Sequence, residues 1–173
     1  MNLLHSSVEK KIDVKQLNFE SWWMENKKRN SIFFTYKLNG DPHEVKIEDT
    51  KYYLKDIQGS SWKPIELWDL YVGAKIDIFG KPTILKRCCL KTVEWNKFYG
   101  EFLNEIKKTL LDEIVKYDRK SLDPKLTKIN KSKALGSTDL RLLIKQVIGL
   151  KDILNKYWPM LSNDIVKAFE GLL

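Results

Sequence analysis

The sequence predicts an α+β fold in which a small antiparallel sheet precedes a helical C-terminal part. Between residues 32 and 87, apolar and polar residues alternate at a period of two, and turns containing glycine interrupt the alternation. After Thr92 the apolar period lengthens to three or four residues, which is typical of an amphipathic helix. The change of period therefore divides the chain into a β-rich part and a helical part.

The β-rich part contains two predicted hairpins. Asn39-Gly40-Asp41-Pro42 supplies the turn of the first hairpin, and Gly80-Lys81-Pro82 supplies the turn of the second. The expected strands are residues 32–38, 45–48, 52–56, 74–78 and 83–87. A helical turn is expected over residues 65–72, where it ends at Gly73. Such short strands predict a sheet that curls.

The segments on either side of the β-rich part are predicted from their composition and from helix-capping residues. Residues 1–30 are predicted to be a polar lead-in whose aromatic residues, Phe19, Trp22 and Trp23, pack against the domain that follows. The β-domain covers residues 31–99 and continues as a helix to about residue 118. Residues 119–136 are predicted to be a basic, solvated linker because lysines outnumber acidic and large apolar residues there.

Residues 137–173 are predicted to hold the C-terminal helices. The first helix begins at Ser137-Thr138-Asp139, which are all good capping residues, and ends before Trp158-Pro159. A shorter helix begins at Ser162 or Asn163.

The charge balance favours an acidic partner. The chain carries 31 basic and 23 acidic residues, a net charge of +8, and its pI is near 9.3. Only 4 of the basic residues are Arg, the side chain best suited to bidentate recognition of guanine or phosphate, and the excess charge is spread evenly along the chain. We therefore expect no nucleic acid as a partner. The apolar runs are also too short for a membrane-spanning helix, and no secretion signal is expected.

Residue types that catalysis requires are scarce. His5 and His43 are expected to be exposed, and neither lies in a Ser/His or Cys/His context. Cys88 and Cys89 are neighbours that would point to opposite faces of a strand, and no second cysteine pair completes a zinc site. The sequence has no glycine-rich phosphate loop and no calcium loop. We therefore expect a protein that is not an enzyme and that uses no cofactor, metal or small-molecule substrate.

Three stretches of the β-rich part resemble a known family. They are the opening hairpin Ile32–Leu38 with Val45–Asp49, the segment Leu67–Lys81, and the step Thr92-Val93-Glu94-Trp95. Together they resemble the DM-ten domain of ciliary proteins. This domain occurs in tandem in the myoclonin-type axonemal proteins that carry EF-hands, and singly ahead of the kinase domains of the axonemal nucleoside diphosphate kinase of type seven. The residues that define the motif here are Asp69, Gly73, Gly80 and Thr92.

The resemblance implies a small pleckstrin-homology-like β-barrel or sandwich. It also implies a structural role on the doublet microtubules of the ciliary axoneme, at the luminal wall, with tubulin and neighbouring inner proteins as partners. Two features depart from the family. Residues 87–91 are basic at a place where the family tends to be acidic, and residues 100–173 contain neither an EF-hand nor a histidine that could serve a kinase domain.

These expectations lead to one functional hypothesis and two alternatives. Because tubulin is strongly acidic, the residues expected to face it are Lys27, Lys28, Arg29, Lys125, Lys128, Lys131 and Lys133. The main alternative is an adaptor of the pleckstrin-homology type that binds a phosphoinositide or a peptide, with Lys37 and Lys46 near the headgroup. The other alternative, binding of single-stranded nucleic acid, requires exposed aromatic residues next to lysines.

Overall fold

The computed structural model describes residues 14–117, 122–129 and 133–157. The described residues form two compact units. The sheet unit comprises residues 14–98 and 133–140, and the helical unit comprises residues 99–117, 122–129 and 141–157.

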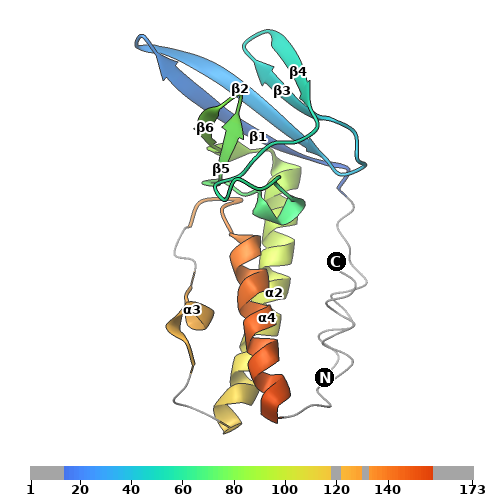
Figure 1. Cartoon of the computed structure of the whole chain (residues 1–173), viewed down its shortest axis with the longest axis vertical. Helices are drawn as coiled ribbons and strands as arrows, with labels where there is room; N and C mark the ends of the chain where they lie inside the picture. Colours follow the sequence, from blue (N-terminus) through green and yellow to red (C-terminus); the bar gives the residue numbers. More distant parts are fainter. Residues whose placement is uncertain (1–13, 118–121, 130–132, 158–173) are drawn as a thin grey trace. The chain divides into compact units, whose positions relative to one another are not determined.

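An antiparallel sheet of five strands, in the order β4-β3-β2-β1-β7, forms the larger part of the sheet unit (Figure 1). Its strands are β1 (Gln16–Glu25), β2 (Lys28–Lys37), β3 (His43–Ile47), β4 (Thr50–Leu54) and β7 (Arg87–Cys88). A separate two-stranded ribbon contains β5 (Lys75–Ile78) and β6 (Lys81–Ile84). The α+β class and the antiparallel sheet are therefore as predicted.

The five-stranded sheet is not closed into a barrel. The barrel form of the expected fold is therefore wrong. A closed barrel requires every strand to have a neighbour on both sides. Strand β4 pairs with β3 alone and β7 pairs with β1 alone, while β5 and β6 pair with each other. Among the described strands, the sheet consequently has two free edges, β4 and β7.

The sheet begins earlier than the sequence predicted. Strand β1 lies inside the expected lead-in, and it pairs with β2 along its whole length. Its alternate residues Leu17, Phe19 and Ser21 are buried, so of the three aromatic residues predicted to pack against the domain Phe19 does so fully. Trp23 is half-buried on the same face, whereas Trp22 lies on the opposite face. The turn to β2 is formed by Asn26 and Lys27, whose φ values are 48° and 62°. A tight hairpin turn without glycine gives little sequence signal, and this explains why the strand was missed.

The two predicted hairpins are confirmed. In the first, Phe34 of β2 is paired with Val45 of β3, and both side chains are buried. In the second, Ile76 of β5 is paired with Thr83 of β6. The predicted third strand is β4, and the last predicted strand ends three residues early at Ile84.

The ribbon and the first turns of α2 (Leu90–Tyr117) cover the inner face of the sheet. Trp23 of β1 donates from Nε1 to Thr83 Oγ1 of the ribbon at 2.9 Å. Trp95 of α2 stacks on Trp68 with ring centroids 5.7 Å apart, an arrangement that contributes about 0.5–1.5 kcal/mol beyond its burial. The buried Thr92 accepts a hydrogen bond at Oγ1 from the Asn18 N–H at 3.0 Å. The beginning of α2 is thus fastened to β1.

The other motif residues shape the backbone ahead of α2. Asp69 ends the short 3-10 helix η1 (Leu67–Asp69) and accepts the Glu66 N–H at 2.9 Å, so it braces the predicted helical turn. Gly73 has a φ of +105° and donates its N–H to the Leu85 carbonyl at 2.7 Å. Gly80 forms the β5–β6 turn with a φ of +78°. Both glycines occupy positions that a side chain would strain.

In the helical unit, α2 lies beside α4 (Leu140–Tyr157), and Lys107 of α2 is hydrogen-bonded to Gln146 of α4 (Figure 1). The predicted stripe of α2 is buried at Phe102, Ile106, Leu110 and Ile114. On α4 the buried residues include Ile144, Val147, Leu150 and Leu154. Helix α4 begins directly after the predicted capping residues and continues to Tyr157, the last described residue. The predicted third helix lies outside the described residues. No described helix is both long enough and apolar enough to cross a membrane.

The predicted solvated linker is attached to both units. In the sheet unit the Gly136 carbonyl accepts the Val72 N–H at 2.8 Å, and a Cβ at Gly136 would lie 2.5 Å from Cys88 Sγ. In the helical unit the linker forms the short helix α3 (Pro124–Thr127), and Leu126 packs against Gly149 of α4. Composition did not reveal these contacts because they use backbone carbonyls and close approaches at glycine.

A buried polar network holds the α3 segment. Lys107 of α2 donates from Nζ to the Lys128 carbonyl at 3.0 Å and to Gln146 Oε1 at 2.9 Å. Gln146 in turn donates from Nε2 to the carbonyls of Lys125 and Lys128. Burial lowers the pKa of Lys107. The network fixes the backbone of Lys125 and Lys128 and leaves both side chains exposed.

Replacing Gly73 with Val is expected to lower the free energy of unfolding by about 1–3 kcal/mol, because a β-branched residue cannot adopt a φ of +105° without strain. Urea denaturation of the full chain measures the change. The matched control is Lys75→Val, which places the same side chain at an exposed strand position nearby. Equal stability of the two variants would contradict the backbone role of Gly73.

Replacing Gln146 with Leu is expected to destabilise the protein by about 1–3 kcal/mol, since the Lys107 ammonium loses an acceptor and the Lys125 carbonyl loses its donor. Hydrogen exchange should show faster opening of residues 123–129. The adjacent exposed substitution Lys145→Leu serves as the control and should stay within about 0.5 kcal/mol of the wild type. Unchanged exchange in the Gln146 variant would refute the network.

Candidate functional site

The outer face of the five-stranded sheet is the side opposite the ribbon and the first turns of α2, and no described element of the sheet unit covers it. Strand alternation places Glu20, Trp22 and Met24 of β1 on this face, across from Phe33 and Arg29 of β2. Met24 is 64% exposed and Phe33 is 46% exposed, which are high values for apolar side chains in central strands. The outer face is therefore an exposed surface that combines apolar and charged groups.

Three cations gather around one indole ring on the outer face. The ring centroid of Trp22 lies 3.6 Å from Arg29 Cζ, 4.1 Å from Lys86 Nζ and 5.5 Å from Arg87 Cζ. Lys86 also donates from Nζ to the Trp22 carbonyl at 3.3 Å. We call these four residues the Trp22 cluster. Each cation gains from the negative face of the indole, by about 0.5–1 kcal/mol at an exposed site.

The arrangement follows from the pairing of β1 with two neighbours. Strand β2 brings Arg29 opposite Met24, and β7 brings Arg87 opposite Glu20, so Trp22 lies between the two arginines on the same face. The sequence analysis selected Arg29 but missed Lys86 and Arg87. Strand β7 has only two residues, which is too short to be recognised from periodicity.

The cations of the Trp22 cluster have no carboxylate partner among the described residues. No ion pair joins Arg29, Lys86 or Arg87 to an acid there, although Glu20 is paired with Arg87 across the strands. Lys81 provides a contrast on the opposite side of the sheet. Its Nζ lies 4.5 Å from the centroid of the Trp23 ring and also forms an ion pair with Glu25. The cluster thus presents charge that a partner can neutralise.

The remaining predicted cations lie in different places. Lys27 and Lys28 are exposed at the β1–β2 turn, next to Arg29 in the sequence. Lys125 and Lys128 are exposed on the α3 segment of the helical unit, and Lys133 is exposed in the sheet unit. Lys131 lies outside the described residues.

His43 is half-buried, so the prediction that it is exposed was wrong. Its Nδ1 accepts the Lys37 N–H at 3.1 Å, and its ring stacks on Tyr36 with centroids 4.2 Å apart. Burial lowers the pKa of His43, and the charge of Asp56 opposes that effect. These contacts give the ring a structural role in the first hairpin. The other histidine, His5, lies outside the described residues.

The two cysteines differ in exposure and in acidity. Cys88 is half-buried, and its burial together with the neighbouring Cys89 raises the pKa of its thiol to about 11. Cys89 is exposed; burial alone would raise its pKa, but hydrogen bonds from Thr92 and Asn18 outweigh that effect and lower it. Among the described residues no three His, Cys, Asp or Glu side chains are grouped so as to hold a metal ion.

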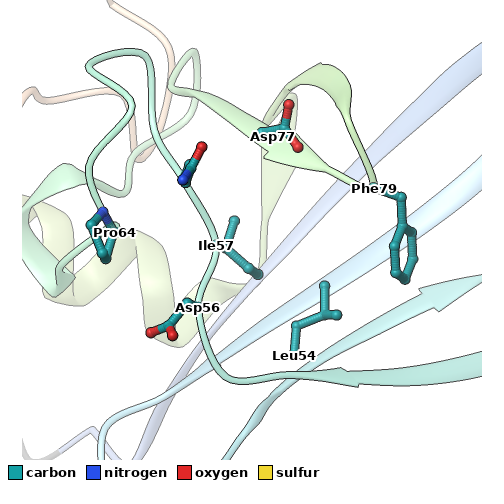
Figure 2. Close-up of a pocket in the computed structure, with 7 residues that line it drawn as sticks. Leu54, Asp56, Ile57, Pro64, Asp77 and Phe79 are labelled. Atoms are coloured by element: carbon teal, nitrogen blue, oxygen red, sulfur yellow. The ribbon is translucent and has the colours of Figure 1, made fainter.

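A pocket of about 420 Å³ lies between the β4–η1 loop and the β5–β6 ribbon. It is lined by Leu54, Asp56, Ile57, Gln58, Pro64, Asp77 and Phe79. Figure 2 shows the carboxylates of Asp56 and Asp77 directed away from each other. Asp77 Oδ1 also accepts the Gly80 N–H at 2.8 Å and so braces the ribbon turn. The two acids do not form a pair suited to acid–base chemistry.

No protein-family model matches this chain, and no curated protein matches its sequence.

Alkylation with iodoacetamide at pH 8 is expected to modify Cys89 at least about tenfold faster than Cys88, because the thiolate is the nucleophile and Cys88 holds its proton to about pH 11. Peptide mass spectrometry on a time course of the folded chain measures both rates. In Cys89→Ser the remaining thiol should react slowly. Equal rates at the two positions would contradict the assigned environments.

Proposed function

We propose that this protein is a non-enzymatic structural protein of ciliary doublet microtubules, located in the lumen, that binds tubulin and neighbouring axonemal proteins. The observation that carries the proposal is the role of the residues shared with the DM-ten pattern. Asp69, Gly73 and Gly80 shape turns, and Thr92 fastens α2 to β1. The pattern therefore specifies a scaffold and leaves recognition to the surface.

The arrangement of the sheet unit supports the sandwich form of a pleckstrin-homology-like fold. A five-stranded sheet and a two-stranded ribbon face each other, and the helix that follows β7 packs beside them. Trp68 and Trp95 stack within this unit. A module of this kind acts by adhesion, because its loops and outer face are available to partners.

Electrostatics supports an acidic partner. The net charge is +8, and exposed lysines lie at the β1–β2 turn and on the α3 segment. A single exposed ion pair contributes about 1 kcal/mol or less, so stable attachment requires several contacts at once. A microtubule lattice offers repeated acidic sites, and binding at many sites raises the overall affinity without a single tight pocket.

The adaptor alternative is less well supported. Lys37, which was expected near a phosphoinositide headgroup, forms an ion pair with Glu44 at 3.0 Å, and that hydrogen bond raises the pKa of Lys37. A headgroup would have to displace Glu44. Binding to phosphoinositide vesicles is therefore measured beside microtubule binding in the experiment that follows.

The full chain is expected to co-sediment with microtubules, and the charge reversals Lys125→Glu, Lys128→Glu and Lys131→Glu together should weaken binding by about fivefold or more. The backbone network around Lys107 should keep the triple variant folded, which circular dichroism checks. The control is Lys108→Glu, Lys145→Glu and Lys156→Glu, which makes the same charge change at exposed helix positions.

Equal loss in the two triple variants would show that net charge, and not the α3 segment, governs binding. A wild-type chain that stays in the supernatant with microtubules and pellets with phosphoinositide vesicles would replace the proposed function with the adaptor.

A further inference from the structure

The Trp22 cluster concentrates arginine, which is scarce among the basic residues of this chain. The sequence contains 4 Arg among its 31 basic residues, and two of them, Arg29 and Arg87, meet at one indole although 58 positions separate them. Their placement depends on strand pairing and not on sequence proximity. A guanidinium is planar and offers paired N–H donors, whereas the lysines elsewhere provide point charges. The cluster is thus the part of the described surface best equipped for directional recognition of an anion.

The geometry favours an oxyanion over a nucleobase. Arg29 Cζ lies 3.6 Å from the centroid of the Trp22 ring, so one face of the indole is covered by the guanidinium. A base that stacks on an aromatic side chain needs that face to be open. The edge of a stacked guanidinium keeps its N–H donors free, and these suit the two oxygens of a carboxylate.

The surroundings distinguish an acidic polypeptide from a polyphosphate chain. Glu20 lies on the same face as the cluster, opposite Arg87, so a continuous track of phosphates would meet repulsion there. Met24 and Phe33 flank the cluster and expose apolar surface. Separate carboxylates interspersed with apolar side chains match this mixture of groups.

We propose that the Trp22 cluster is the binding site for an acidic polypeptide segment, in which Asp or Glu carboxylates pair with the guanidinium groups of Arg29 and Arg87. Lys86 adds a third positive charge, and Met24 and Phe33 contact apolar side chains of the segment. This assignment rests on the proposed function, because a partner in the axoneme would supply the segment. The proposed binding surface belongs to the sheet unit and shares no residue with the α3 lysines tested above.

The test measures binding of a fluorescein-labelled hexaglutamate peptide to the full chain by fluorescence anisotropy at low salt. The double variant Arg29→Ala, Arg87→Ala should bind about tenfold more weakly. Arg29→Lys with Arg87→Lys keeps the charge and should still lose about threefold or more, because an ammonium cannot pair with both oxygens in the same plane. Glu20→Gln should strengthen binding by about twofold, since it removes a negative charge beside Arg87.

Lys81→Ala is the matched control. Lys81 also stacks on a tryptophan, and its removal lowers the charge by one, but Glu25 already neutralises it. The affinity of the Lys81→Ala variant for the peptide should stay within about twofold of that of the wild type. Circular dichroism of each variant confirms that the sheet is intact.

Three outcomes would overturn the assignment. One is equal loss of peptide binding in Lys81→Ala and in the double alanine variant of Arg29 and Arg87, and another is full binding by the double lysine variant. The third is tighter binding of single-stranded oligothymidylate or of phosphoinositide vesicles than of the peptide at the same ionic strength.

Microtubule co-sedimentation of the same variants separates this assignment from the proposed function. Peptide binding that depends on the arginines, in a chain that does not pellet with microtubules, would support the assignment and refute the proposed function. Microtubule binding that is the same in the wild type and the double alanine variant, without peptide binding, would refute the assignment and leave the proposed function standing.

Discussion

The position of β1 between β2 and β7 is the constraint on which the rest of the sheet unit depends. Its inner residues, Leu17 and Phe19, form part of the core, and its Asn18 N–H holds the beginning of α2 through Thr92. Its outer residue Trp22 receives cations from both neighbouring strands. One strand therefore connects core packing, the start of the long helix and the most charged part of the outer face.

The inner and outer faces of the sheet therefore have different roles. On the inner face, hydrogen bonds and aromatic stacking fix the ribbon, the turn at Gly73 and the first turns of α2, so substitutions there act on stability. On the outer face, apolar and cationic groups remain exposed, so substitutions there act on binding. The helical unit shows the same division between structural and exposed groups. Lys107 and Gln146 donate hydrogen bonds to backbone carbonyls of the α3 segment, while the lysine side chains of that segment are exposed to solvent.

The sequence predicted those elements whose signal is local. Alternation with a glycine turn identified the hairpin around Gly40, and the helical period with capping residues identified α2 and α4. Strand β1 was missed because Trp22 and Trp23 make both faces apolar and its turn contains no glycine. Half of the candidate site was missed for a related reason. Arg29 belongs to a visible basic run, but the approach of Arg87 depends on a two-residue strand paired across 67 positions.

The arrangement of the outer face requires that β1 bring Trp22 against Arg29, Lys86 and Arg87. Solution NMR of the full chain tests it directly, because the field of the indole ring shifts the resonances of protons above its face. Side-chain protons of all three cations should resonate upfield of their positions in Trp22→Leu, and cross-strand contacts between Glu20 and Arg87 should be present. Unshifted resonances in the wild-type chain, or the absence of β1–β7 contacts, would contradict it.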